Sequence, residues 1–304
     1  MKKFMCVTCV VFGLGASAFA QTTNSNYTAT IFGAPHVNTA GGERSDTRSI
    51  AADGKGSILV LRRSDPQVLI FNREGELQDS WGEGLFLDSH NIDVDHEGFV
   101  WIGDRSGQMI YKFTMDGQQV MALGTKGVAG NNSSPDAFNR ASDVAIAPNG
   151  DIFVADGYRN NRIVHFSSDG AFMKVIGGVA GKEPGEFEEI HGVQIDSRGR
   201  LIVLDGHSNE PRIQVWDQNG TFIEEWPDLD LIMGSGFTMD ADDTVYVGDT
   251  DGERIKVVKE GRTIEVIGGL EARPHNITLD PGTGALYLAD TGTLGGKIKK
   301  IIRK

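Results

Sequence analysis

Three of the chain's seven histidines open short segments that resemble one another. His90 begins HNIDVDHEGFVWIGD, His191 begins HGVQIDSRGRLIVLD, and His275 begins HNITLDPGTGALYLAD. Three imidazoles around one point are a familiar ligand set for Zn²⁺, and they leave a further coordination position open to water or substrate. A single histidine of this kind is more often a partly buried structural residue. The recurrence at one position of three segments favours a zinc site made by His90, His191 and His275.

These segments belong to a repeat that extends along the chain. Each copy has an alternating apolar strand, a turn and a second strand, and most copies end that second strand in Asp. A third strand follows, and in most copies a fourth. Four strands at a period of about 40 to 50 residues are the signature of propeller blades. The copies span residues 48–62, 90–104, 142–156, 191–205, 235–249 and 275–290. The repeat therefore predicts an all-β, six-bladed β-propeller.

The first residue of each copy is expected at the mouth of the central axis. Histidine holds this place on blades two, four and six, which are related by about 120° in a six-fold ring. The three imidazoles should therefore converge on the axis. His36, His96 and His165 are expected on the surface. His207 could line the same mouth and is not assigned to the metal. In ring order the six first residues are Arg48, His90, Ser142, His191, Ser235 and His275.

The last copy has no outer strand of its own before Lys304. The segment YTATIFG, Tyr27 to Gly33, has the pattern of an outer strand and precedes the first copy. Because a closed ring leaves no unpaired sheet edge, we expect this N-terminal strand to complete the sixth blade. Residues 21–304 would then form a single domain.

The first 20 residues have the pattern of a secretory signal. Two lysines precede an apolar run, and small residues stand at Ala18 and Ala20, so we expect cleavage between Ala20 and Gln21. Both cysteines and two lysines would leave with this segment, which moves the formal charge from −13 to −15. Such an acidic chain has no electrostatic footprint for nucleic acid, and no later segment is apolar enough to span a membrane. We expect a secreted or periplasmic monomer that acts on a small molecule or a peptide.

The chain also resembles a known family over most of residues 21–304. FNRASDVAIAPNGDIFVADGYRNNRIVHFSSDGAF (138–172) is the most similar stretch, and PGEFEEIHGVQID, RIQVW and RPHNITLD continue the likeness. These motifs are similar to those of the peptidyl-α-hydroxyglycine α-amidating lyases, which are NHL-repeat six-bladed propellers. The family cleaves a C-terminal α-hydroxyglycine to a peptide amide and glyoxylate.

The resemblance implies a role for each of several residues. His90, His191 and His275 would hold zinc, and Tyr158 would be the catalytic tyrosine. Arg63 would be the active-site arginine, although the adjacent Arg62 allows a second register. The backbone carbonyls of Ile50 and Ile92 would hold a structural Ca²⁺.

Three positions depart from the family pattern. Arg159 replaces a disulfide-bonded cysteine, Asn276 replaces a calcium-binding aspartate, and no arginine stands at Gly206 or His207, where the family has one. These changes leave room for the lyase chemistry on a different substrate. A non-catalytic NHL-repeat propeller that binds a peptide, a glycan or an envelope protein is the alternative. A calcium-dependent lactonase is a further one, but it needs acidic and amide ligands where this repeat offers histidines.

Overall fold

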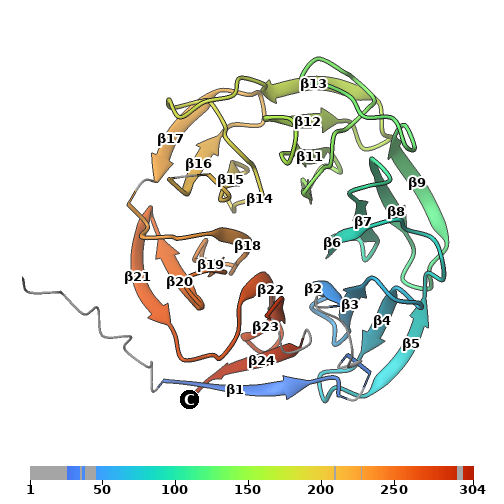
Figure 1. The fold of residues 1–304 in the computed structure, drawn as a ribbon, viewed down its shortest axis with the longest axis vertical. Helices are drawn as coiled ribbons and strands as arrows, with labels where there is room; N and C mark the ends of the chain where they lie inside the picture. The colour runs from blue at the N-terminus through green and yellow to red at the C-terminus, as the bar shows by residue number, and fades with distance from the viewer. Residues whose placement is uncertain (1–25, 35, 38–45, 209, 227, 293–296) are drawn as a thin grey trace, which may run out of the picture.

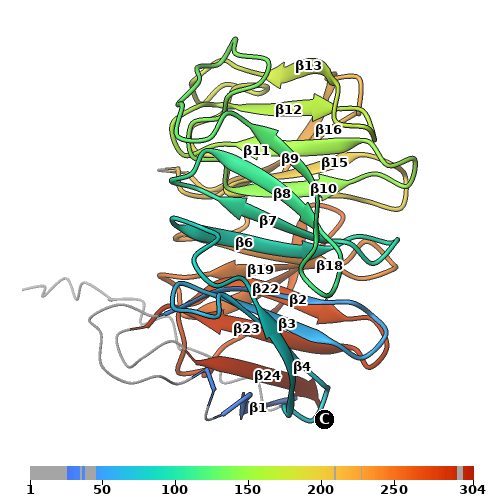
Figure 2. The ribbon, with the colours of Figure 1, turned by 90° about the vertical axis from the view of Figure 1, so that its right-hand side faces the viewer.

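A computed structural model describes residues 26–34, 36, 37, 46–208, 210–226, 228–292 and 297–304. Within these residues the 24 regular elements are all β-strands, and they form six four-stranded antiparallel sheets. The sheets stand around a central axis like blades, with one strand of each sheet innermost (Figure 1). Seen from the side, the strands of successive blades are stacked next to one another (Figure 2). The predicted all-β six-bladed propeller is confirmed. The predicted signal peptide, residues 1–20, lies outside the described residues.

The blades follow the order of the repeat, with strands numbered along the chain. Blades one to three contain β2 (Thr47–Ala52), β3 (Ile58–Arg62), β4 (Val68–Phe71) and β5 (Leu77–Trp81); β6 (Ser89–Val94), β7 (Val100–Asp104), β8 (Met109–Phe113) and β9 (Gln119–Gly124); and β10 (Asp143–Ile146), β11 (Ile152–Asp156), β12 (Arg162–Phe166) and β13 (Phe172–Gly177). Blades four to six contain β14 (Gly192–Ile195), β15 (Leu201–Asp205), β16 (Arg212–Trp216) and β17 (Phe222–Trp226); β18 (Gly234–Met239), β19 (Val245–Asp249), β20 (Arg254–Lys259) and β21 (Arg262–Ile267); and β22 (Pro274–Asp280), β23 (Ala285–Asp290), β24 (Ile298–Arg303) and β1 (Tyr27–Phe32).

The hydrophobic core lies between the blades. There are six clusters of buried apolar side chains, and each combines residues of two neighbouring blades. The second strand of a blade is therefore covered on both faces, which explains continuous apolar runs such as ILVL in β3 and IFVA in β11. The outermost strands β5 and β17 are exposed or half-buried along most of their length, and each buries only its last residue, Trp81 or Trp226.

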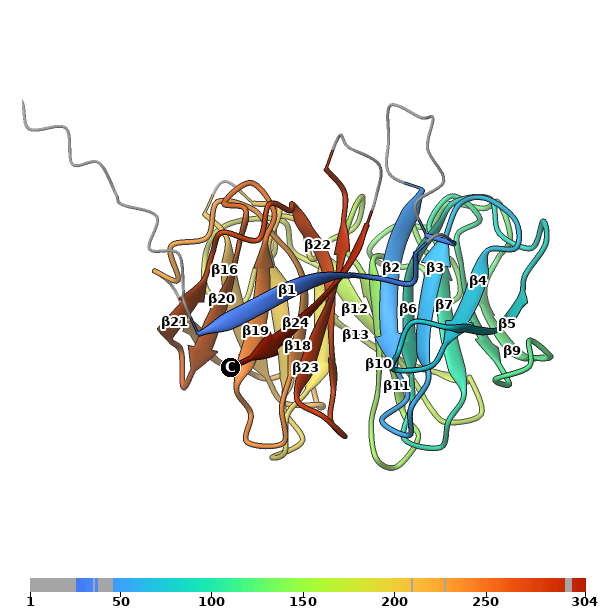
Figure 3. The same ribbon diagram turned by 90° about the horizontal axis from the view of Figure 1, so that it is seen from below.

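The N-terminal strand closes the ring. β1 pairs antiparallel with β24, from Tyr27 opposite Arg303 to Phe32 opposite Ile298. The two strands lie side by side at the rim (Figure 3). Gly33, the last residue of the predicted strand, instead turns the chain with a φ of 69°. The first and last parts of the described chain thus share one blade. No helix within the described ranges is long and apolar enough to cross a membrane.

Candidate metal centre and active site

Buried aspartates hold the segments that lead to the three axial histidines. The second strand of each of these blades ends in an Asp that is at most 8 % exposed. Its carboxylate accepts a hydrogen bond from the backbone N–H of the residue two positions before the histidine. Because this contact recurs on blades two, four and six, it brings each histidine to the axis at an equivalent height. The three pairs are Asp88 with Asp104, Glu189 with Asp205, and Arg273 with Asp290.

Local irregularities in the innermost strands aim two of these side chains. The pairing register of β6 with β7 shifts between Ser89 and Asn91, so His90 is the residue at a β-bulge. The register of β22 with β23 shifts in the same way around His275. A bulge bends the strand and redirects a side chain. His191 directly precedes β14, and its backbone N–H donates to the Leu204 carbonyl (2.8 Å).

The three imidazoles meet on the axis. Their ring centres are 5.3 to 5.5 Å apart, and one nitrogen of each lies within 4.8 Å of the other two. His90 and His191 are buried, and His275 is half-buried. The structure thus brings together the three histidines that the repeat singled out.

Backbone groups of the neighbouring blades fix the protonation of these rings. Nδ1 of His90 donates to the Ser142 carbonyl (3.0 Å), and Nδ1 of His275 donates to the Arg48 carbonyl (3.2 Å). His191 likewise hydrogen-bonds the backbone of Ser235. Because a carbonyl only accepts, the rings of His90 and His275 carry their proton on Nδ1 and present the Nε2 lone pair to the axis. This arrangement of a neutral imidazole with an oriented second nitrogen is the one that metal-binding histidines adopt.

The surroundings also keep the rings neutral. Burial lowers the pKa of His90 and of His191 well below the usual value for histidine. Burial, together with His207, lowers the pKa of His275 to about 3. Neutral imidazoles are required for metal ligation, so no proton has to be displaced from these residues at neutral pH.

Tyr158 stands directly at this centre. Its hydroxyl lies 2.9 Å from Nε2 of His90 and 2.8 Å from Nε2 of His191. The phenolic hydrogen can be donated to only one of these two nitrogens, so two acceptor lone pairs face a single hydrogen. A cation among the Nε2 atoms would relieve this mismatch, and in this respect the residues fit a metal ion. Burial raises the pKa of Tyr158 well above its ordinary value, and the nearby Arg105 opposes that shift.

The structure distinguishes between the two candidate arginines. Arg62 is buried, and its guanidinium donates to the carbonyls of Asp65 and Pro66, which gives it a structural role in the turn. Arg63 instead reaches toward the mouth and pairs with Asp88 (3.2 Å). The geometry therefore places Arg63, and not Arg62, beside the axial centre.

Arg105 is a site residue that the sequence analysis missed. It follows Asp104 at the end of β7, its Cζ lies 5.1 Å from the centre of the Tyr158 ring, and it pairs with Asp88 at 2.6 Å. The repeat offered a signal, because Arg105 directly follows the second strand of blade two as Arg63 directly follows that of blade one. The other four copies carry Gly or Thr at this position.

His207 lines the mouth, as predicted. Its ring centre is 4.2 Å from that of His191, and its nitrogens contact Glu189 (3.1 Å) and the Ser235 hydroxyl (3.2 Å). The interpretation of His165 as a surface residue is wrong. It is 6 % exposed because it stacks on Phe153 and pairs with Asp151.

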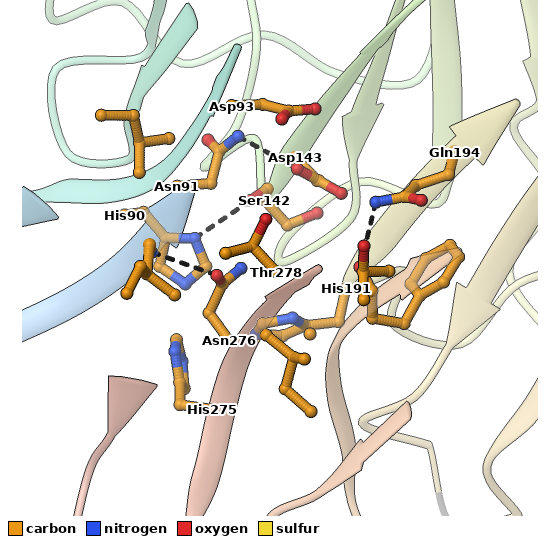
Figure 4. A pocket seen from close by; sticks show the side chains of 16 residues that line it. His90, Asn91, Asp93, Ser142, Asp143, His191, Gln194, His275, Asn276 and Thr278 are labelled. Atoms are coloured by element: carbon orange, nitrogen blue, oxygen red, sulfur yellow. Dashed lines mark hydrogen bonds between the residues drawn. The ribbon is translucent and has the colours of Figure 1, made fainter. Parts of the chain in front are cut away.

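A small cavity of about 50 Å³ continues along the axis from the triad (Figure 4). Ile50, Ile92 and Asn276, the residues of the predicted calcium site, line it. The Asn276 side-chain oxygen accepts a hydrogen bond from the Ile50 backbone N–H (3.1 Å), so this oxygen is already engaged. Calcium binding by the two carbonyls stays a prediction.

Two carboxylates that the sequence analysis did not consider, Asp93 and Asp143, also line this cavity. Burial raises the pKa of Asp93 to about 6 and that of Asp143 to about 7. Asp143 accepts hydrogen bonds from the Asn91 side chain (3.0 Å) and from the Val193 backbone (3.0 Å). Two acidic groups therefore line the axial cavity together with the three histidines.

Comparisons with known proteins support the relationship to NHL-repeat propellers and amidating lyases that the sequence motifs indicate. A family model described as a 6-bladed beta-propeller (DUF5128) matches residues 138–259. Human NHL repeat-containing protein 3 is 29 % identical over 274 residues, which cover 81 % of this chain and 77 % of that protein. A Caenorhabditis elegans protein named as a probable peptidyl-alpha-hydroxyglycine alpha-amidating lyase is 34 % identical over 149 residues. That match covers 48 % of this chain and less than half, 42 %, of the worm protein.

A solved structure described as a gluconolactonase from Xanthomonas campestris has the same fold. Its TM-score is 0.66 at 13 % identity, over 86 % of this chain and 88 % of that one. At this identity the likeness concerns the fold alone. With the repeat, the ring and the sequence relatives taken together, the chain is an NHL-repeat six-bladed β-propeller related to the peptidyl-α-hydroxyglycine α-amidating lyases.

Proposed function

We propose that this chain is an exported zinc-dependent lyase that cleaves the N–C bond of an N-acyl-α-hydroxyglycine. The products would be the N-acyl amide and glyoxylate. The observation that carries this proposal is the position of the Tyr158 hydroxyl, within 2.9 Å of Nε2 of His90 and of His191. A proton-transferring group thus stands at a three-histidine metal centre, and the relatives named as amidating lyases supply the reaction class.

The reaction rearranges bonds within one molecule. The hydroxyl proton leaves, the C–O bond becomes the aldehyde of glyoxylate, and the C–N electron pair moves to nitrogen, which gains a proton. No water, oxidant or reductant is consumed. A zinc ion held by the three Nε2 atoms would supply a Lewis acid that lowers the pKa of a bound hydroxyl group.

The chain's own residues would transfer the proton and bind the substrate. Tyr158 is placed to accept the hydroxyl proton and to return it to the departing nitrogen. Burial raises the pKa of Tyr158, so a phenolate there needs neighbouring positive charge, and Arg105 provides it. Arg63 carries a guanidinium at the same mouth, which suits a carboxylate such as that of hydroxyglycine.

The test is an assay of residues 21–304 with N-benzoyl-α-hydroxyglycine. We expect glyoxylate and benzamide in equal amounts, loss of both after chelation, and recovery when zinc is added back. A zinc-loaded protein that forms neither product would refute the lyase proposal. The alternative of a non-catalytic NHL-repeat propeller that binds a peptide, a glycan or an envelope protein would then take its place.

Export is a separate part of the proposal, and it rests on residues 1–20. Expression with the full N-terminus in a bacterial host should give a mature protein that starts at Gln21. N-terminal sequencing of the periplasmic or secreted fraction checks this. Recovery of the chain in the cytoplasm with Met1 intact would contradict it.

A further inference from the structure

His191 is the member of the axial triad that no β-bulge aims. His90 and His275 each stand at a register shift, whereas His191 directly precedes β14, whose pairing with β15 is regular. A second imidazole lies against it instead, because the ring centre of His207 is 4.2 Å from that of His191, with 36° between the ring planes. We propose that His207 is a positioning residue that holds the His191 ring in the orientation for metal binding, and that its two hydrogen-bond partners fix His207 for this role.

The backbone that carries His207 is anchored to the next blade. His207 follows the Asp-Gly pair at the end of β15, just as Tyr158 follows the Asp-Gly pair at the end of β11. A Cβ at Gly206 would lie 1.9 Å from the Gly234 carbonyl oxygen, so this close approach requires glycine. The Gly206 carbonyl also accepts a hydrogen bond from the Gly234 N–H (3.0 Å). The His207 side chain therefore starts from a fixed point beside the innermost strand of blade five.

Both nitrogens of the His207 ring have partners. Nδ1 lies 3.1 Å from Oε1 of Glu189, and Nε2 lies 3.2 Å from the hydroxyl of Ser235. The Ser235 hydroxyl is held in turn by the hydroxyl of Thr250 (2.6 Å). Glu189 comes from the connection before β14, and Ser235 belongs to β18 of the neighbouring blade. Because the ring cannot turn without losing one of these contacts, the two partners set its plane.

His191 thus lies between two aromatic side chains. Tyr158 meets its edge, with the hydroxyl 2.8 Å from Nε2, and His207 lies against its face. The nitrogens of His207 are engaged by Glu189 and Ser235, so His207 supports a ligand without becoming one. Groups that orient a metal ligand from outside commonly contribute about 10- to 100-fold to metal affinity. The inference rests on the proposed metal centre for this consequence, whereas the contacts of His207 do not depend on a metal ion.

The first measurement is the zinc dissociation constant of residues 21–304, obtained by competition with a chelator. His207→Ala and Glu189→Ala should each raise it on the order of tenfold or more. Glu189→Gln should restore most of the affinity, because its amide oxygen still accepts a hydrogen bond from Nδ1. The visible absorption spectrum of the Co²⁺-loaded protein should change in His207→Ala. His96→Ala, which removes an exposed histidine, is the control for both measurements.

The second measurement needs no metal ion. Nuclear magnetic resonance of isotope-labelled histidines in the metal-free protein reports which ring nitrogen of His191 carries the hydrogen. We expect a single tautomer of His191 in the wild-type protein and in Glu189→Gln. In His207→Ala and Glu189→Ala we expect a mixture of tautomers or exchange-broadened signals, because the ring is free to turn.

Unchanged His191 signals in both alanine variants would overturn the inference, even with weaker zinc binding, because His207 would then act by another route. An unchanged zinc dissociation constant in both variants would overturn it as well. If the wild-type protein binds no zinc, the proposed metal centre fails and the resonance comparison alone decides the positioning role. If zinc binds but N-benzoyl-α-hydroxyglycine gives no glyoxylate, the lyase proposal fails while the role of His207 stands.

Discussion

At the scale of single residues, the axial centre depends on where one hydrogen sits on each imidazole. Backbone groups of the next blade hold that hydrogen on Nδ1 of His90 and His275, so that Nε2 faces the axis. Tyr158 then approaches two of these nitrogens with one hydrogen of its own. The side chain proposed to move a proton and the side chains proposed to bind metal are thus different groups, and substitution can separate them.

Tyr158→Phe should remove the proton transfer and keep the metal site. We expect kcat for N-benzoyl-α-hydroxyglycine to fall about 100-fold or more, the usual scale for a positioned acid or base. Zinc content and melting temperature should stay unchanged, because the hydroxyl is not a ligand in this scheme. Tyr246→Phe, a half-buried tyrosine of β19, is the matched control and should keep full activity. A fully active Tyr158→Phe would show that another group moves the proton.

Asp143 should make the free energy of unfolding depend on pH. Burial raises its pKa from 3.8 to about 7, so its contribution is fully present below pH 4 and is lost as pH rises through 7. Asp143→Asn should remove this loss, which is on the order of a few kcal/mol. Chemical denaturation at pH 4, 6 and 8 measures it, with the exposed Asp116→Asn as control. If the free energy of unfolding changes as much between pH 4 and pH 8 in Asp143→Asn as in the wild-type protein, the prediction is contradicted.

The sequence predicted the site residues that follow the repeat and missed those that depend on contacts between loops. His90, His191 and His275 were found because one frame position recurs, and Tyr158 because its motif resembles a family. Arg105 pairs with Asp88, which lies in the connection that precedes its blade, and no local sequence pattern predicts that contact. The buried state of His165 was missed for a similar reason, since its partner Asp151 lies directly before β11, outside the strand that carries His165.

At the scale of elements, residues at the ends of the strands position the axial histidines. A buried Asp at the end of the second strand fixes the loop that leads to each axial histidine, and bulges in β6 and β22 aim two of the rings. The sequence showed the recurrent Asp but not its role. Its carboxylate accepts a hydrogen bond from the backbone of the loop that precedes the blade, and the sequence pattern does not show that contact. The strand pattern itself was predictable, since apolar runs bounded by Gly turns recur in every blade.

Removing β1 should open the ring. Deletion of residues 21–34 would leave the edge of β24 unpaired along its contact from Ile298 to Arg303. We expect aggregation or a large fall in melting temperature, because an unpaired edge both loses hydrogen bonds and invites intermolecular pairing. Deletion of residues 21–25 alone, which precede β1, is the control. If the longer deletion melts like the intact protein, β1 does not close the propeller.

At the scale of the whole molecule, the propeller converts a repeat along the chain into a cluster in space. Alternate blades present histidine, and the ring places their Nε2 atoms on one axis although the residues are far apart in sequence. The fold was predictable down to its closure, because the sixth repeat lacked an outer strand and the N-terminus offered one. The inner cavity with Asp93 and Asp143 was not, because it exists only once six strands surround it.

The central claim is that this axial cluster holds one zinc ion, and metal analysis tests it most directly. Residues 21–304, expressed in zinc-replete medium and freed of loosely bound metal, should contain about one zinc per chain, as expected for a three-histidine site. His191→Ala should lose the metal, whereas His96→Ala, an exposed histidine of the blade that carries His90, should keep it. A wild-type protein that folds with no bound transition metal, or His191→Ala protein that retains a full zinc equivalent, would contradict the account.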